Sequence, residues 1–250
     1  MPVKKTAIFF VFLVTTFLFS CNTGYRARSV QYKDYRISNS NQPDSGLLVL
    51  LQPYTDSVNK SMNDIIAVSE IELVNKRPEG TLGNILADAA LAMARINYKI
   101  KVDAGIINYG GIRLPVVVAG NITRGTVFEI SPFDNVLVVL KIKGNILQQL
   151  LDHIAGSGGW PCAGLSYQIK NKKAVNITID GLPFNEMSLY TIATNDYIAN
   201  GGDDCSMLRG QEQINNGFLF RDAVIAYFTR FTRAGKKLWV KTENRVTHAE

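Results

Sequence analysis

The apolar segment at residues 136–142 constrains the fold more than any other part of the chain. It reads VLVVLKI, and its β-branched side chains favour an extended strand with both faces buried. We therefore expect a central strand of a sheet here. The segment SPFDN at residues 131–135 comes directly before it, so its aromatic ring should lie at the entrance of that strand.

Hydrophobic periodicity and turn residues predict the other elements. Helices are expected at 45–63, 84–96, 144–154 and 218–231. The first should have a kink or break at Pro53, and the second should have Asn84 at or near its N-cap. Strands are expected at 65–74, 102–108, 164–170, 174–180 and 188–194, with a hairpin across Lys172 and Lys173. A turn and a short helix are expected over 121–127. Because helices and strands mix without a regular alternation, the predicted fold class is α+β.

The first residues have the pattern of a secretory signal. Lys4 and Lys5 precede an apolar run at 7–14, and small Ser20 stands before Cys21. This resembles a bacterial lipobox, in which residues 1–20 are removed and Cys21 becomes a lipidated first residue. The expected organisation is a signal at 1–20, a lipid anchor and tether at 21–44, and one domain at 45–250 in the bacterial cell envelope, anchored to the membrane. The alternative is ordinary cleavage near Ser20 with a free cysteine.

Net charge and the two remaining cysteines constrain the function of the chain only weakly. Removing Lys4 and Lys5 lowers the formal charge from +6 to +4, and much of the remainder is concentrated in the basic tether, so we expect no nucleic-acid partner. Cys162 and Cys205 lie in glycine-rich loops. They could form a disulfide or remain as two partly buried thiols.

Three polar loops carry the candidate functional residues: NYGGIR at 108–113, the SPFDN segment, and TNDYIANGGDD at 194–204. Their aromatic rings, one arginine and amide or carboxylate acceptors suit a flat polar heterocycle that carries a ribose. Two glycines allow the backbone to approach a ligand closely, and Arg113 could meet a phosphate or a sugar diol. The alternatives are that the glycine pair only forms a turn and that Phe133 is a core aromatic residue.

A catalytic metal centre is not predicted in this chain. Two-metal phosphoesterase sites need several histidines and carboxylates, whereas the sequence has only His153 and His248. His153 is expected to be a packing or surface residue, and His248 to lie in a frayed end. Ser131 has no histidine nearby in the sequence to activate it. We expect no phosphate hydrolysis by this chain alone.

The order of four motifs, at 83–89 (GNILADA), 108–113, 131–135 and 195–204, resembles the C-terminal domain of the bacterial and animal 5′-nucleotidase family, from about residue 45 to the end. The resemblance implies a substrate-binding domain without catalytic metals of its own, because in that family a separate N-terminal metallophosphoesterase domain holds two divalent metals and performs hydrolysis. For this chain we expect the partner to be a separate metallophosphoesterase chain that holds the two divalent metals. It implies a nucleobase held between Phe133 and Tyr197. The other implied substrate-binding residues are Asn108, Gly110, Gly111, Arg113, Asn135 and Asp203, with Arg113 on the phosphate side.

This sequence departs from the family pattern at three places. Pro78 stands before Glu79 where the family usually has an arginine, and Arg77 is shifted by one residue. Tyr109 replaces a glycine, and Asp204 with Cys205 replaces a glycine and an aromatic residue. These departures concern phosphate recognition more than base stacking.

The sequence therefore predicts the lipid-anchored, nucleotide-recognising part of a split 5′-nucleotidase in nucleotide catabolism. Two alternatives stay open. The chain could be a non-catalytic nucleoside-binding surface lipoprotein, or a structural protein on a degenerate fold.

Overall fold

The computed structural model describes residues 29, 31–34 and 44–249. The chain divides into two units, Met1–Leu48 and Val49–Glu250, and the fold described below is that of the second unit. The predicted signal, Cys21 and most of the predicted tether lie outside the described residues. None of the helices in the described part of the chain is both long enough and apolar enough to cross a membrane.

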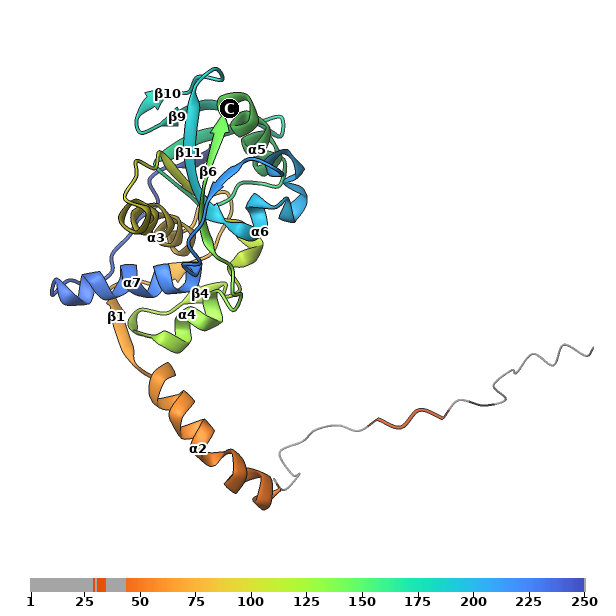
Figure 1. The fold of residues 1–250 in the computed structure, drawn as a ribbon, viewed down its shortest axis with the longest axis vertical. Coiled ribbons are helices and arrows are strands. Elements are labelled where there is room, and N and C mark those ends of the chain that lie inside the picture. The colour runs from red at the N-terminus through yellow and green to blue at the C-terminus, as the bar shows by residue number, and fades with distance from the viewer. Residues whose placement is uncertain (1–28, 30, 35–43, 250) are drawn as a thin grey trace, which may run out of the picture. The chain divides into compact units, whose positions relative to one another are not determined.

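Helices and strands alternate irregularly along the chain (Figure 1), and the predicted α+β class is confirmed. The helices are α2 Ser45–Met62, α3 Thr81–Tyr98, α4 Arg124–Ile130, α5 Gly144–Gly156, α6 Asp196–Ala199 and α7 Phe220–Arg233, with 3-10 turns η1 Tyr109–Gly111, η2 Gly202–Asp204 and η3 Ser206–Leu208. The strands are β1 Ile65–Ser69, β2 Leu73–Val74, β3 Ala104–Ile106, β4 Val116–Val117, β5 Gly120–Thr123, β6 Leu137–Lys143, β7 Cys162–Ala163, β8 Leu165–Lys170, β9 Lys173–Ile179, β10 Leu182–Pro183, β11 Leu189–Asn195, β12 Glu212–Ile214 and β13 Val246–His248.

A five-stranded sheet with the order β12-β6-β11-β3-β7 organises the fold. Its longest pairing joins β6 and β11 in antiparallel register, while β11 and β3 are parallel. The run at 136–142 thus forms an interior strand, as predicted, because β6 has a neighbour on each side. Parallel pairing of β3 with β11 brings the carboxyl ends of these two strands together at one edge of the sheet.

Alternate residues of β6 belong to two separate cores. Leu137 and Val139 pack into the core that contains α3 and α7. Val138 and Leu140 pack into the other core, with α5 and the β8–β9 hairpin. Because successive side chains of a strand point to opposite faces, the sheet is covered on both sides, which explains its nearly continuous apolar sequence.

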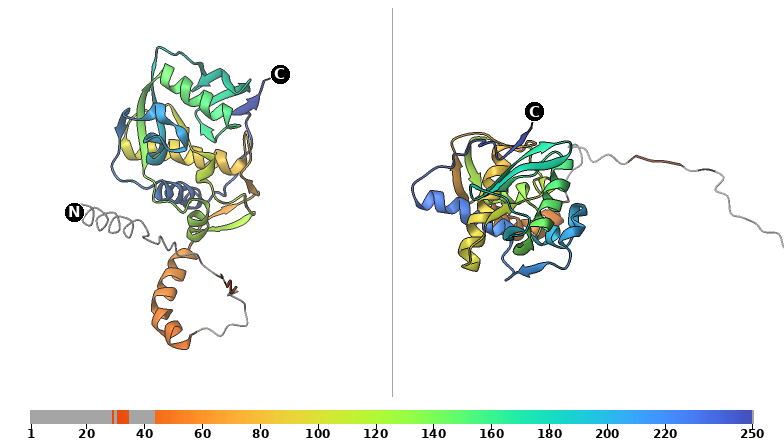
Figure 2. Two further views of the ribbon diagram at one scale, coloured as in Figure 1. Left: turned by 90° about the vertical axis from the view of Figure 1, so that its right-hand side faces the viewer. Right: turned by 90° about the horizontal axis from the view of Figure 1, so that it is seen from above.

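A second sheet, with the order β10-β9-β8-β13, packs against α5. Figure 2 shows the C-terminal strand β13, in dark blue, beside the teal strands of the hairpin. His248 lies in β13, so the prediction of a frayed end is wrong, because parallel pairing with β8 extends to that residue. The hairpin turn lies at Asn171 and Lys172, one residue earlier than predicted, since these two residues adopt the positive φ angles of the turn.

The predicted strand at 65–74 is wrong as one element. The chain turns after Ser69, whose hydroxyl donates to the carbonyl of Ile71 at 2.7 Å, and the Glu70 N–H donates to Leu238. The two halves, β1 and β2, then pair with different strands, β5 and β4. Apolar side chains alternate with small or acidic ones through the turn as well, so the sequence pattern did not indicate the turn.

Asn84 is not at a helix cap, contrary to the prediction. Helix α3 begins at Thr81 with Gly80 as its N-cap, so Asn84 lies inside the helix and is buried. Its amide donates to Glu79 Oε1 at 2.7 Å and to the Lys241 carbonyl at 3.2 Å. The Asn84 side chain therefore connects the helix to the C-terminal segment instead of ending the helix.

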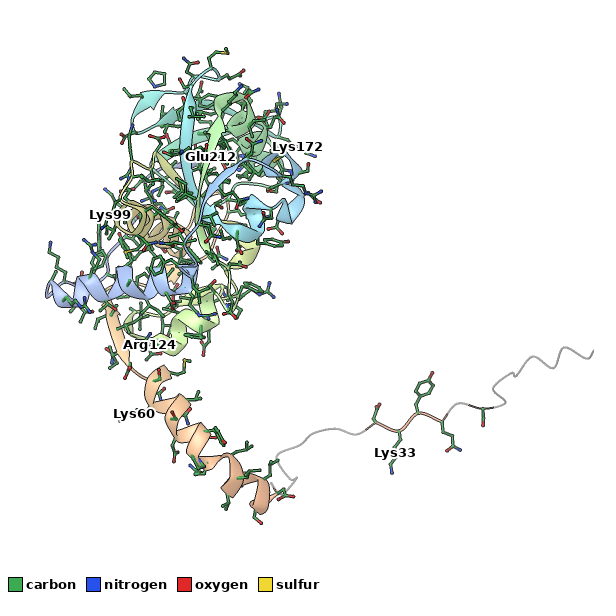
Figure 3. All side chains as sticks on the ribbon, in the orientation of Figure 1. Lys33, Lys60, Lys99, Arg124, Lys172 and Glu212 are labelled. Atoms are coloured by element: carbon green, nitrogen blue, oxygen red, sulfur yellow. The ribbon has the colours of Figure 1, made fainter. Side chains whose placement is uncertain are left out.

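Near residues 121–127 the prediction of a turn and short helix is correct only for the helix. Residues 120–123 form β5, and α4 starts at Arg124, which is labelled in Figure 3. The hydroxyl of Thr123 accepts from the Thr126 N–H at 3.1 Å in a capping box. Helix α2 passes through Pro53 without a break, and its side chains in the described structure are not buried.

The two cysteines of the second unit are separate buried thiols. Cys162 and Cys205 are only 2% and 0% exposed, so they are more deeply buried than the partly buried thiols of the sequence-based alternative. Loss of solvation raises the pKa of each thiol from 9.0 to about 12. Both are therefore protonated and shielded at neutral pH.

We predict that thiol-specific labelling at pH 8, followed by peptide mass spectrometry, leaves Cys162 and Cys205 unmodified until the protein unfolds. Because folding raises both pKa values, burial of the neutral thiols contributes stability that is complete below about pH 9 and is lost as the pH rises towards 12. Urea titrations should show the free energy of unfolding falling over that pH range. Rapid labelling of either native thiol at pH 8 would contradict the buried arrangement.

Candidate functional site

One pocket of about 370 Å³ collects residues from the three polar loops. The residues that line it are Asn108, Gly110, Gly111, Arg113, Phe133, Asn135, Tyr197 and Asp203. These are the eight residues that the sequence predicted for substrate binding. They come from the segment after β3, the loop before β6 and the α6–η2 segment, so the sheet brings together residues from three distant parts of the chain.

A chain of amide hydrogen bonds connects two of the residues that line this pocket with Asn195. Asn195 ends β11 and Asn108 follows β3, and the Asn195 Nδ2 donates to Asn108 Oδ1 at 2.9 Å. Asn108 Nδ2 then donates to Asp203 Oδ2 at 2.8 Å. Both asparagines are buried, so each polar atom needs a partner, and these bonds orient the Asp203 carboxylate.

Asn195 supports the candidate site without lining the pocket, and the sequence did not identify it. Its Oδ1 also accepts from the Ile198 N–H at 2.9 Å, which caps helix α6. An asparagine just before a short helix is the signal that could have found it. This one side chain thus fixes both Asn108 and the start of the helix that carries Tyr197.

Tyr197 and Asp203 hold each other in the pocket wall. The Tyr197 hydroxyl donates to Asp203 Oδ1 at 2.9 Å and accepts from the Asp203 N–H at 3.2 Å. Asp203 has left-handed backbone angles, with φ 47° and ψ 41°. Gly202 gives the tyrosine ring room, because a Cβ there would lie 2.5 Å from Cζ of the ring. The ring is nonetheless 47% exposed.

Phe133 is also open to solvent, with 41% of its surface exposed. The alternative that it is a core aromatic residue is therefore wrong. Ring contacts among the described residues do not include a contact between Phe133 and Tyr197. Each ring contributes to the pocket without being covered by the other, which leaves both available for stacking on a flat ligand.

Gly111 has a steric role in the pocket lining. A Cβ on Gly111 would lie 2.7 Å from Asn108 Oδ1, so a side chain there would displace the asparagine. Arg113 is exposed, and its Nη1 donates only a long hydrogen bond, of 3.4 Å, to the Gly110 carbonyl. Its guanidinium therefore has donors left for an anionic group on a ligand.

Two departures from the family pattern contact one another. The guanidinium of Arg77 lies over the Tyr109 ring, 4.2 Å from its centroid, in a cation–π contact. Tyr109 packs against the core beneath α5. Arg77 is thus held next to the glycine turn, although neither residue lines the pocket itself.

His153 supports the loop that carries Asp203. Its Nε2 is 2.8 Å from the Asp203 carbonyl, and its ring packs edge-on against Trp160 at 6.3 Å. The expected packing role of this histidine is confirmed. In the described part of the chain, histidine, cysteine and carboxylate side chains do not gather in groups of three or more that could hold a metal ion.

A larger, more open hollow of about 500 Å³ lies between α7 and the helices α3 and α4. Its polar lining includes Arg124, Arg230 and Arg233, but no aromatic ring. It therefore lacks the stacking surface that the smaller pocket offers, and we take the smaller pocket as the candidate site.

The geometry agrees with comparisons to known proteins. A family model described as the 5′-nucleotidase C-terminal domain matches residues 59–210. The chain belongs to this family. All eight pocket residues fall within the matched region.

The relatives are longer proteins. The chain is 28% identical to Protein 5NUC of Lutzomyia longipalpis over 68% of its own length and 36% of the relative's. It is also 28% identical to a 5′-nucleotidase of Vibrio vulnificus, over 73% of this chain and 34% of the relative. It thus spans about a third of the length of these curated relatives.

A solved 5′-nucleotidase precursor from Thermus thermophilus superimposes with a TM-score of 0.69 and 26% identity, covering 83% of this chain and 44% of that protein. The NAD nucleotidase of Haemophilus influenzae has the same fold, with a TM-score of 0.62 and 19% identity, over 83% of this chain and 42% of its own. These solved structures share the fold of this chain, in agreement with its membership of the 5′-nucleotidase C-terminal domain family.

We predict that Gly202→Ala moves the Tyr197 ring out of its present position. The new Cβ would meet the far end of a flexible side chain, so the ring shifts and its hydrogen bonds to Asp203 are lost. The cost to stability should be about 1 kcal/mol, because the loss is that of one exposed hydrogen-bonded pair. A crystal structure and thermal denaturation measure the two effects.

The matched control is Gly156→Ala, where the nearest atom to a new Cβ is 3.8 Å away. It should leave Tyr197 in place. An unmoved tyrosine in Gly202→Ala would mean that the close packing of ring and backbone does not hold.

Proposed function

We propose that this domain binds a nucleoside or 5′-nucleotide in the pocket, with the base between Phe133 and Tyr197. The observation that supports this most strongly is that two exposed rings and an oriented carboxylate, from separate loops, line one pocket. Its volume of about 370 Å³ is in the usual range for small-molecule sites.

The polar groups suit the two ends of such a ligand. Each Asp203 oxygen accepts one hydrogen bond from the protein and can still accept another from a ribose hydroxyl. Asn135 supplies an amide in the same pocket. Arg113, with its free donors, would meet the phosphate of a nucleotide, and a planar fork of donors matches phosphate oxygens well.

Hydrolysis is assigned to another polypeptide, a metallophosphoesterase that holds two divalent metals. The metal-ligand set of such a centre does not match the residues around this pocket, which offer one carboxylate and no histidine. We further propose that the chain is a lipoprotein of the bacterial cell envelope, with its signal at residues 1–20 and its membrane anchor on Cys21. This chain would then present the nucleotide, and its partner would supply the chemistry.

Calorimetry with adenosine tests recognition. We expect binding by the wild type, and about ten-fold or greater weakening in Phe133→Ala and in Tyr197→Ala, because one stacked ring contributes about 1 to 3 kcal/mol. The matched control is Phe184→Ala, which removes a ring that stacks on Tyr190 outside the pocket. It should leave adenosine affinity unchanged.

The outcomes separate the alternatives. Equal weakening in all three variants would point to loss of structure rather than of stacking. No heat with adenosine or AMP, from a folded wild-type protein, would exclude recognition and leave a structural protein on this fold.

Phosphate release tests the split enzyme. Candidate metallophosphoesterases from the same organism are assayed on AMP alone, with the wild-type domain, and with Phe133→Ala. We expect the wild type to increase kcat/KM for one partner, and Phe133→Ala to abolish most of the increase because the base loses a wall of its slot. Nucleoside binding without an increase for any partner would favour the non-catalytic surface lipoprotein.

A further inference from the structure

Arg221 is the charged residue among the buried residues of the described structure. Its side chain is only 9% exposed, and it lies in the first turn of α7. Burial of a charge is costly unless the charge is paired, and a cation at a helix N-terminus also opposes the helix dipole. Its Nε atom is buried without a hydrogen-bond partner. Arg221 thus combines a buried charge, an unfavourable place at a helix N-terminus and an unpaired Nε atom.

The contacts of Arg221 converge on the loop that carries Phe133. Nη1 donates to the Phe133 carbonyl at 3.2 Å, and Nη2 donates to Asp134 Oδ1 at 2.6 Å. The guanidinium plane is supported by the Phe128 ring, 4.0 Å from its centroid. The Asp134 side chain is 81% exposed, so the buried cation is paired with a carboxylate that solvent could otherwise satisfy.

A backbone hydrogen bond also joins the start of α7 to the loop that carries Phe133. The Phe220 N–H donates to the Asn135 carbonyl at 2.8 Å. Residues 133 and 134 are thus bonded to Arg221 and residue 135 to Phe220, although the two segments are more than eighty positions apart. The other end of this loop continues from α4, and the Ser131 N–H bonds to Val127.

We propose that Arg221 is a positioning residue for the Phe133 wall of the pocket. It does not line the pocket and would not touch the ligand. By fixing the carbonyl of Phe133 and the following carboxylate, it holds the exposed ring ready for stacking, so less ordering is required when a base binds. This inference rests on the proposed nucleoside recognition, but its structural part can be tested without a ligand.

The first experiment measures the order of the loop in the full chain. NMR relaxation should show the backbone order parameters of Phe133 and Asp134 falling from about 0.85 to below 0.6 in Arg221→Met, while strand β8 stays rigid. Arg230→Met, on the same helix but in contact with the other hollow, is the matched control and should change neither. Asp134→Ala removes one of the contacts at an exposed position, and it should also loosen the loop. This variant provides the test if Arg221→Met does not fold.

The second experiment measures binding of adenosine and of ribose 5-phosphate, which has no base. We expect Arg221→Met to weaken adenosine about ten-fold, similar to loss of one stacked ring, and to leave ribose 5-phosphate within two-fold. Arg221→Lys keeps the charge but not the planar fork, so it should recover only part of the loss. In a Phe133→Ala background, Arg221→Met should cost no further adenosine affinity.

Each result supports or overturns the assignment. Equal weakening of both ligands, or full additivity with Phe133→Ala, would show a general structural role and overturn it. An unchanged loop in both Arg221→Met and Asp134→Ala would do the same without any ligand. If the wild type binds neither compound, nucleoside recognition fails, whereas the relaxation data still decide whether Arg221 holds the loop.

Discussion

The hydrogen-bonded chain from Asn195 through Asn108 to Asp203 is the interaction on which the candidate site depends. It exists because β3 and β11 are parallel neighbours whose carboxyl ends meet at one sheet edge. Two buried amides must find partners there, and the bond from Asn195 Nδ2 to Asn108 Oδ1 forms only with both loops in place. The polar groups of the pocket are therefore ordered by the centre of the fold, before any ligand is bound.

The two aromatic walls are held in different ways. Tyr197 is fixed from within its own segment, by its hydroxyl on Asp203 and by close packing on Gly202. Phe133 is fixed from outside, since its loop is bonded to the start of α7. An exposed aromatic ring on a loop loses side-chain and backbone freedom when it stacks, and prior attachment of the loop lowers that cost. Both half-exposed rings of the pocket are thus held by contacts that their own segments make with the rest of the domain.

The residues that depart from the expected family motifs include two, Arg77 and Tyr109, that contact one another. Tyr109, in place of a glycine, provides the ring over which the shifted Arg77 lies. Asp204 and Cys205 follow the pocket carboxylate, and the Cys205 sulfur is buried in the core beneath it. His153 then braces the same segment through the Asp203 carbonyl. These residues are scattered along the sequence, and each contacts or neighbours a segment that lines the pocket.

The sequence by itself determined the elements with strong periodicity, such as β6 and α5. The family resemblance of its ordered motifs indicated the eight residues that line the pocket, and their role in binding stays a prediction. Apolar spacing and ordered motifs are local properties, so they can be read without knowing the partners of a segment. It did not determine the break after Ser69, the burial of Asn84, the capping role of Asn195 or the attachment of Phe133 to Arg221. Those features depend on contacts between residues that are distant along the chain, and only the paired sheet and the packed helices decide which groups come within hydrogen-bonding distance.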